Sequence, residues 1–214
     1  MEDPLRPPAE PERAAFALIE TLGFRPGIGF PRRARHLARM ARSAAAFGLP
    51  FDAAAAAACL DAIAGPTALR VRLTLDAAGR IAATTAPLPP APPVWRVAIA
   101  QERLCSTDPW LGHKTTRRGV YDRARAALPP GLDEAILCNE AGALCEGGIT
   151  TLFLRRGGLF VTPPLSAGLL PGILREELLE AGAAVEAPLT PADLARGDLF
   201  MGNSLRGLIP ARLG

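Results

Sequence analysis

A run of prolines divides this chain and constrains its fold more than any other feature. Five of the seven residues from Pro87 to Pro93 are proline. Proline has no backbone N–H to give to a helix or a sheet, so this run favours a stiff linker. A chain of 214 residues is long enough for two small domains. We therefore expect a disordered N-terminus over 1–12, a small α/β domain over 13–88, a linker over 89–93 and a larger domain over 94–214.

The hydrophobic pattern predicts different elements on the two sides of the linker. Before the linker, apolar residues recur with helical spacing over 32–47 and 51–64. Residues 69–75 alternate as a strand and 81–85 pairs back as a hairpin, whereas the apolar run 14–22 fits either a helix or a strand. Beyond the linker the pattern predicts two helices, 117–128 and 174–181, among the short strands 94–100, 134–138, 150–154, 159–161 and 199–201. The whole pattern favours an α+β chain.

The charge of the chain does not indicate a nucleic-acid-binding surface. Its net charge is only +3, and the arginines are spread out apart from a cluster between Arg32 and Arg42. A nucleic-acid surface concentrates its basic residues, and this cluster is typical of a solvated helix face. The sequence shows no signal-peptide pattern, and no stretch approaches the roughly 20 apolar residues of a membrane span. We expect a cytoplasmic protein that binds neither nucleic acid nor membrane.

The cysteines and histidines do not form a metal or disulfide pattern. No two cysteines form a CxxC pair, and neither histidine stands at metal-ligand spacing from a cysteine. The residues concerned are Cys59, Cys105, Cys138, Cys145, His36 and His113. We expect no metal site and no disulfide framework.

The basic residues include a single lysine. Of the 24 lysines and arginines, 23 are arginine and one is Lys114. Arginine can replace lysine wherever a position needs only positive charge. It cannot do so where a neutral primary amine must attack a carbonyl carbon, because the guanidinium is always protonated. Lys114 is therefore a candidate for a lysine that forms a Schiff base; the alternative is that one lysine survives by chance.

Several short motifs occur in a fixed order along the chain, at 20–21, 36–39, 113–116, 145–153, 162–165 and 168–175. With these motifs, residues 15–213 resemble the class IV aminotransferase family, whose members bind pyridoxal 5′-phosphate on fold type IV. The resemblance implies an α+β fold with a small N-terminal α/β domain and a larger, β-barrel-like C-terminal domain with helices. It also implies pyridoxal phosphate as the cofactor.

The resemblance assigns the two central roles to Lys114 and Glu146. Lys114 aligns with the family's Schiff-base lysine, whose amine, once freed, can also move a proton. Glu146 aligns with the partner of the pyridine nitrogen. A carboxylate there keeps the nitrogen protonated and makes the ring a better electron sink. Without the resemblance, Glu146 would be interpreted as a surface residue in a strand turn.

The resemblance also assigns residues to the rest of the cofactor. Ile173 and Leu174 lie at a predicted helix start, where backbone N–H groups and the helix dipole favour the phosphate. Ser204 matches a hydroxyl donor to the phosphate, and Arg39 matches a phosphate-binding arginine, although Arg39 also fits a solvated helix face. Tyr121, the only tyrosine, could bond the cofactor's phenolic oxygen, but a lone aromatic on a helix is more often part of a core.

Three features depart from the family pattern. The strand hairpin that usually precedes Glu20 has no room here, Gly23 stands where relatives often place arginine, and Thr151 stands where many have asparagine. The missing hairpin would otherwise contribute to the lid and the dimer contacts. The glycine at position 23 removes an arginine that relatives use to bind the substrate's carboxylate. We expect a homodimer, because the family closes its site with a neighbouring subunit and the short N-terminus leaves surface of the first domain to be covered.

Residues 113–122 and 202–210 resemble one branch of the family, the 4-amino-4-deoxychorismate lyases. Members of this branch release pyruvate from a small-molecule substrate to form 4-aminobenzoate for folate synthesis. The substrate has two carboxylates, for which Arg206 and Arg118 are candidates, and Thr21 is a further substrate candidate. One alternative is an amino-acid transaminase of the branched-chain or D-amino-acid type. Another is a cofactor-binding module without turnover.

Overall fold

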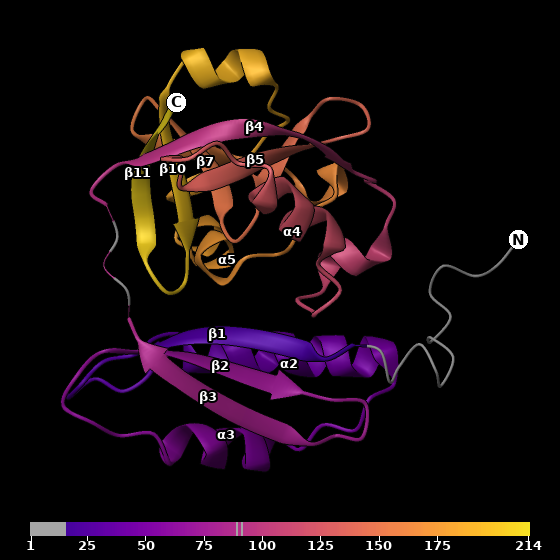
Figure 1. Ribbon diagram of the computed structural model, residues 1–214, viewed down its shortest axis with the longest axis vertical. Helices are drawn as coiled ribbons and strands as arrows, with labels where there is room; N and C mark the ends of the chain where they lie inside the picture. The colour runs from indigo at the N-terminus through magenta and orange to yellow at the C-terminus, as the bar shows by residue number, and fades with distance from the viewer. Residues whose placement is uncertain (1–15, 89, 91) are drawn as a thin grey trace, which may run out of the picture. The chain divides into compact units, whose positions relative to one another are not determined.

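A computed structural model describes residues 16–88, 90 and 92–214. The expected N-terminus, 1–12, lies outside these residues, as do two positions of the expected linker, 89 and 91. The chain divides into two compact units (Figure 1). The first comprises Met1–Pro90 and His113–Arg117, and the second comprises Ala91–Gly112 and Arg118–Gly214.

In the part of the first unit that the structure describes, a three-stranded antiparallel sheet packs with the helices α2 (Arg33–Phe47) and α3 (Ala53–Asp61) (Figure 1). The strands of the sheet are β1 (Leu18–Phe24), β2 (Leu69–Leu75) and β3 (Ile81–Pro87). The sheet order is β1-β2-β3, α2 contacts β1, and α3 contacts β3. The ambiguous apolar run becomes strand β1, because it pairs with β2 from Leu18 opposite Leu75 to Phe24 opposite Leu69.

Local signals fix the end of α2 and the start of α3. The chain leaves α2 through Gly48, whose φ of 63° is a left-handed conformation that glycine adopts without a steric penalty. Asp52 caps α3, since its Oδ1 accepts hydrogen bonds from the backbone N–H groups of Ala54 and Ala55 at 2.8 and 3.0 Å. The cap places the start of α3 two residues later than the hydrophobic pattern predicts.

The second unit is built around a closed barrel of six strands. Its strands are β4 (Trp95–Leu104), β5 (Glu134–Asn139), β6 (Leu144–Gly147), β7 (Thr151–Arg156), β8 (Leu159–Thr162), β9 (Ala184–Glu186), β10 (Asp198–Asn203) and β11 (Gly207–Leu213). Its α-helices are α4 (Gly119–Ala126) and α5 (Ile173–Glu180). The order β10-β11-β4-β5-β6-β7 closes because β7 also pairs with β10, while β8 and β9 extend the sheet beyond β7.

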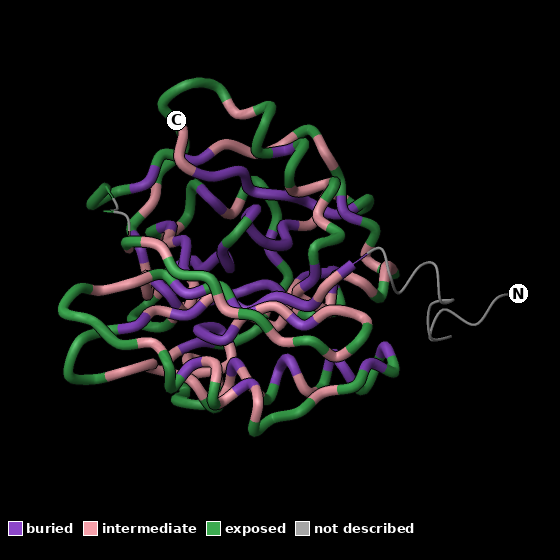
Figure 2. The backbone as a smooth tube through the Cα atoms, turned by 60° about the horizontal axis from the view of Figure 1, so that its bottom comes forward, coloured by how far each residue is buried: buried purple, intermediate pink, exposed green. Residues whose placement is uncertain are grey.

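Strand β5 is buried on both faces, so its side chains divide between two cores. Ile136 and Cys138 belong to the apolar cluster that includes Leu152 and Met201 of the neighbouring barrel strands. Ala135, one residue away, belongs to a second cluster with residues of α4. Strands β5 and β6 are buried along their whole lengths and are among the buried stretches coloured purple in Figure 2.

The expected fold class, α+β with a barrel-like C-terminal part, is confirmed. The hydrophobic pattern missed β6, β9 and β11. Strand β6 is buried throughout and does not alternate, β9 has three residues, and β11 contains Pro210, which weakens a strand pattern. The first unit also includes 113–117, which we expected in the second domain. The reason is two backbone hydrogen bonds to the N-terminal part of the sheet, Ile19 N–H to Lys114 O and Thr116 N–H to Ala17 O.

The described ranges contain no helix with the length and apolar character needed to cross a membrane. Within the same ranges, no three His, Cys, Asp or Glu side chains lie close enough together to hold a metal ion. All four cysteines are free thiols.

Candidate functional site

The segment that carries Lys114 extends the sheet of the first unit beyond β1. Leu18 and Thr115 form an antiparallel bridge, and the N–H of Ile19 donates to the carbonyl of Lys114 at 2.9 Å. Opposite residues of antiparallel strands share a face, and side chains along a strand alternate between faces. This alternation places Lys114 on the same face as Ile19 and Thr21.

His113 anchors the same segment to helix α2. Its Nδ1 shares a hydrogen bond of 2.9 Å with the hydroxyl of Ser43, and its ring meets the ring of Phe47 edge-on at 4.7 Å between centroids. Burial lowers the pKa of His113, which favours a neutral imidazole at neutral pH. The backbone beside Lys114 is therefore held both by the sheet and by α2.

The opposite face of the sheet carries a buried cluster of charged and polar groups. The carboxylate of Glu20 accepts from Nε and Nη2 of Arg39 at 2.8 and 2.7 Å, and lies 2.6 Å from Nδ1 of His36. Burial alone would raise the pKa of Glu20. The charge of Arg39 and the hydrogen bonds from Arg39 and His36 outweigh burial and lower this pKa to about 2. Glu20 is therefore ionised throughout the neutral range.

Arg39, predicted as a phosphate ligand, has a structural role in this cluster. It is only 4% exposed, and its guanidinium makes a two-pronged ion pair with Glu20. Since Glu20 and Thr21 are adjacent on a strand, Arg39 meets the sheet on the face that does not carry Thr21. The phosphate contact of Arg39 stays a prediction.

Two arginines that the motifs did not indicate lie on the face of Thr21. Arg72 is the register partner of Thr21 and Arg70 that of Gly23. Both are exposed, and neither has an ion-pair partner among the described residues. The alternation of 69–75 could have revealed them, because it places both arginines on the polar side of the strand.

In the second unit, Glu146 lies at the end of β6 and receives two hydrogen bonds on its Oε1. The Tyr121 hydroxyl donates at 2.6 Å and the Leu170 backbone N–H at 3.3 Å. Glu146 is only 5% exposed. It is therefore a buried residue and not the surface residue that its place in a strand turn suggests. The Tyr121 hydroxyl donates its hydrogen bond to Glu146. The contact of Tyr121 with the cofactor's phenolic oxygen stays a prediction.

The other predicted residues of this unit lie beside Thr151 of β7. Thr151 is the register partner of Glu146 on β6 and of Gly202 on β10. A Cβ atom on Gly172 would lie 2.5 Å from the Thr151 hydroxyl oxygen, so this position requires glycine. Gly172 is also the N-cap of α5, where the first backbone N–H groups have no partner within the helix and can bind an anion.

The predicted phosphate donors thus lie close to Glu146 along one edge of the barrel. Ile173 and Leu174 are the first two residues of α5 and are buried. Ser204 follows the last residue of β10, Asn203. The side-chain oxygen of Asn203 accepts from the backbone N–H groups of Leu205 and Arg206 and fixes the turn.

The two predicted substrate arginines of this unit both have other contacts. Arg118 donates to the carbonyl of Gly148 and lies 5.0 Å from the ring centroid of Tyr121. The guanidinium of Arg206 lies 5.8 Å from the ring centroid of Trp95. Their contacts with a substrate stay predictions.

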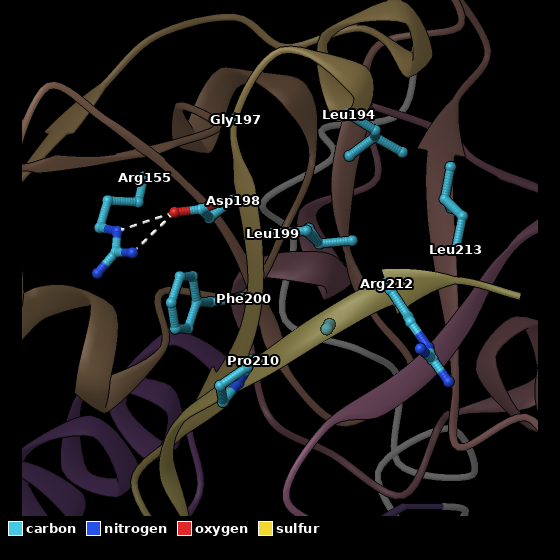
Figure 3. A pocket seen from close by; sticks show the side chains of 10 residues that line it. Arg155, Leu194, Gly197, Asp198, Leu199, Phe200, Pro210, Arg212 and Leu213 are labelled. Atoms are coloured by element: carbon cyan, nitrogen blue, oxygen red, sulfur yellow. Dashed lines mark hydrogen bonds and ion pairs between the residues drawn. The ribbon is translucent and has the colours of Figure 1, made fainter.

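A surface hollow of about 570 Å³ lies elsewhere, along β10 and β11 (Figure 3). On one side Arg155 pairs with Asp198 at 2.7 Å and lies over the ring of Phe200. The hollow is lined by none of the predicted site residues. Because its one carboxylate is already paired, the hollow has no free acid or base for catalysis.

Comparison with known proteins identifies the family. The profile of the family described as amino-transferase class IV matches residues 17–213. The chain belongs to this family. Its members depend on pyridoxal 5′-phosphate, which confirms the expected cofactor and an enzyme that uses it.

Individual relatives carry the names of two different activities. A crystal structure of a Mesorhizobium loti protein, provisionally named an amino-acid aminotransferase, is 45% identical, with a TM-score of 0.89 and coverage of 93% of this chain and 100% of that one. A Schizosaccharomyces pombe protein provisionally named aminodeoxychorismate lyase is 29% identical over 71% of this chain and 68% of its own length. A Thermotoga maritima protein provisionally named branched-chain-amino-acid aminotransferase is 32% identical over 50% of this chain. That match spans less than half of the relative, 40%.

The buried cluster at Glu20 generates a prediction about acid stability. Glu20→Gln leaves Arg39 buried without its counter-ion and should lower the free energy of unfolding by about 3–5 kcal/mol at neutral pH. The folded-state pKa of Glu20, about 2, lies below its ordinary value of 4.5. Its contribution is therefore complete above pH 4.5 and is lost as the pH falls from 4.5 to 2. Urea unfolding at a series of pH values should show a steeper loss for the wild type than for the variant.

Asp61→Asn is the matched control, because it removes an exposed ion pair with Arg33 that joins α2 to α3. This variant should keep the wild-type stability closely, since exposed pairs contribute little. Parallel pH profiles for wild type and Glu20→Gln would contradict the assigned role of Glu20.

Proposed function

We propose that the chain is a pyridoxal-phosphate-dependent 4-amino-4-deoxychorismate lyase, which releases pyruvate and forms 4-aminobenzoate. The observation that carries the proposal is the sheet face shared by Lys114, Thr21, Arg70 and Arg72. The substrate has two carboxylates, and two exposed arginines on the lysine's face suit a dianion. The glycine at position 23, opposite Arg70, leaves room for a flat ring.

The described residues fit the cofactor. Lys114 supplies the chain's only side-chain primary amine, and Glu146 supplies a buried carboxylate for the pyridine nitrogen. The start of α5 lacks a side-chain cap, which suits a phosphate in place of one, and Ile173 and Leu174 would donate their N–H groups there. Ser204 would add a hydroxyl, whereas the predicted phosphate contact of Arg39 would compete with its buried ion pair to Glu20.

When bound, pyridoxal phosphate supplies an electron sink that stabilises negative charge developed on the substrate. Lys114 would hold the cofactor through its Nζ, and its free amine would take a proton from the substrate ring and return one to the enolpyruvyl group, which would leave as pyruvate. Glu146 would hold a proton at the ring nitrogen. Arg70 and Arg72 bind and orient the substrate's carboxylates.

The second candidate function is an amino-acid transaminase. The names of the Mesorhizobium loti and Thermotoga maritima relatives favour it. It needs the same Lys114 and Glu146, but a branched-chain substrate has one carboxylate and so needs fewer cations. A module without turnover is less well supported, because both central residues are present. The homodimer, the cytoplasmic location and the role in folate synthesis stay predictions.

The first prediction from this proposal concerns Lys114. Lys114→Ala should lose the visible absorption band that pyridoxal phosphate shows when bound to a lysine amine. Lys114→Arg, the matched control, keeps the charge and should lose the band as well, because a guanidinium cannot replace the amine. Borohydride reduction of the wild type followed by mass spectrometry should place the cofactor on Lys114. A reduced adduct on any other residue would falsify the assignment.

The second prediction distinguishes the two activities. Purified enzyme given 4-amino-4-deoxychorismate should release pyruvate and 4-aminobenzoate in equal amounts. A panel of amino-acid and keto-acid pairs, assayed side by side, should show much slower amino-group exchange. Fast exchange without pyruvate release would establish the transaminase and reject the lyase.

The third prediction concerns the arginine opposite Thr21. Arg72→Gln should raise KM for 4-amino-4-deoxychorismate by about tenfold to a hundredfold, the equivalent of a lost charge-assisted hydrogen bond. Arg80→Gln is the control, because Arg80 is an exposed arginine of the same unit that pairs with Asp76 in the β2–β3 turn. Both variants should keep the wild-type melting temperature. Unchanged kinetics in Arg72→Gln would remove this arginine from the substrate site.

A further inference from the structure

The hydroxyl of Tyr121 and the carboxylate of Glu146 form a short hydrogen bond within the second unit, 2.6 Å long. The N–H of Leu170 approaches the same carboxylate oxygen, Oε1, at 3.3 Å. Two donors from different segments, α4 and the loop before α5, restrict rotation of the carboxyl group. The orientation of Glu146 therefore depends on Tyr121.

The turn after Glu146 is held from two sides. Arg118, at the start of α4, donates to the carbonyl of Gly148. The carboxylate of Glu134, a fully buried residue of β5, accepts from the hydroxyl of Thr150 at 2.9 Å. The backbone that carries Glu146 is thus fixed, and the hydrogen bond from Tyr121 acts on the carboxyl group itself.

Tyr121 is built to remain a donor. Burial, followed by the neighbouring charge of Glu146, raises the pKa of Tyr121 well above its usual range. The hydroxyl therefore keeps its proton at neutral pH. The guanidinium of Arg118, 5.0 Å from the ring centroid, holds the ring in place from the other side.

We propose that Tyr121 is a positioning residue that keeps Glu146 anionic and oriented, and that it thereby sets the protonation of the cofactor's pyridine nitrogen. The inference rests on the proposed role of Glu146. A donor stabilises a carboxylate over the neutral acid. With the donor in place, the proton shared between Glu146 and the ring nitrogen stays on the nitrogen. Without it, the carboxylate becomes more basic and draws this proton toward itself.

This role differs from the phenolic-oxygen contact that the sequence suggests for Tyr121. A phenol has one proton to donate, and the structure gives that proton to Glu146. A contact with the phenolic oxygen would act first on the ionisation of that oxygen, whereas a contact through Glu146 acts directly at the ring nitrogen. The two roles therefore predict changes in different spectroscopic signals.

The test is Tyr121→Phe in the holoenzyme, loaded with pyridoxal phosphate labelled with ¹⁵N in the ring. At neutral pH the ring-nitrogen resonance should be pyridinium-like in the wild type and should move toward the neutral-pyridine position in the variant. The kcat should fall by about tenfold to a hundredfold, whereas KM should change little, because the hydroxyl does not touch the substrate. An unchanged ¹⁵N resonance in Tyr121→Phe would overturn the inference. A shift of the cofactor's visible band without a change in the ¹⁵N resonance would overturn it as well, because it would indicate a role at the phenolic oxygen.

Thr162→Val is the matched control. It removes another buried hydroxyl of the second unit, one that donates to the carbonyl of Leu152 at 2.9 Å. Thr162→Val should lower the free energy of unfolding about as much as Tyr121→Phe. The ¹⁵N resonance of its bound cofactor should match that of the wild type. An equal ¹⁵N shift in this control would overturn the inference, because it would show that any loss of a buried hydroxyl has the same effect.

Glu146→Gln separates this inference from the proposed function. If the glutamine variant keeps a pyridinium-like resonance and full activity, the proposed role of Glu146 fails and the inference fails with it. If Glu146→Gln moves the resonance and Tyr121→Phe does not, only the inference about Tyr121 fails. In the double variant, Tyr121→Phe should add no further shift, because its effect passes through Glu146.

A second measurement leaves Tyr121 unchanged, so it can be made even if the Tyr121→Phe protein folds poorly. Tyr121 is the only tyrosine, so tyrosine labelled with ¹³C at Cζ reports on this hydroxyl alone. At neutral pH, the Cζ resonance should differ between Glu146→Gln and the wild type, because the hydroxyl then donates to a neutral amide in place of a carboxylate. An identical Cζ resonance in the two proteins would show that Tyr121 and Glu146 are not coupled and would overturn the inference.

Discussion

The pairing of β7 with β10 is the constraint on which the second unit depends. It closes the barrel, and it places Thr151 between Glu146 on one side and Gly202 on the other. The start of α5 packs against the same threonine through Gly172. A carboxylate, a helix N-terminus and the turn of Ser204 thus meet at one edge because a single strand has partners on both sides. A one-residue slip of β7 would turn its side chains, Thr151 among them, to the other face and would separate these groups.

In the first unit, strand alternation separates stability from the proposed chemistry. Glu20 and Thr21 are neighbours in sequence but point to opposite faces of β1. Glu20 anchors α2 through Arg39 and His36, while Thr21 shares its face with Lys114 and Arg72. Glu20 therefore stabilises the unit, whereas its neighbour Thr21 lies on the face of the proposed substrate site. The Glu-Thr motif in the sequence does not distinguish these two roles.

The sequence predicted the fold class and the family, because helical spacing, alternation and ordered motifs are local signals. Strand 69–75 was placed with its observed bounds for the same reason. What it missed depends on contacts distant in the chain. Residues 113–117 join the first unit through hydrogen bonds to β1, nearly a hundred residues away. Arg72 became a candidate only from its register with Thr21, and Tyr121 gained a partner only when α4 met β6.

Three buried glutamates of the described residues show how the surroundings of a carboxylate decide what it can do. Glu20 has cationic and imidazole partners that lower its pKa to about 2, which suits a permanent counter-ion but not a group that shares a proton. Burial raises the pKa of Glu134, although backbone and hydroxyl donors and the charge of Arg125 oppose this rise, and its carboxyl group holds a structural turn. Glu146 accepts from a phenol and an amide at one oxygen. Neutral donors of this kind stabilise an anion without adding a positive charge, and they favour a carboxylate that can hold a cationic ring nitrogen. An arginine in place of Tyr121 would satisfy the same oxygen but would also repel a protonated ring.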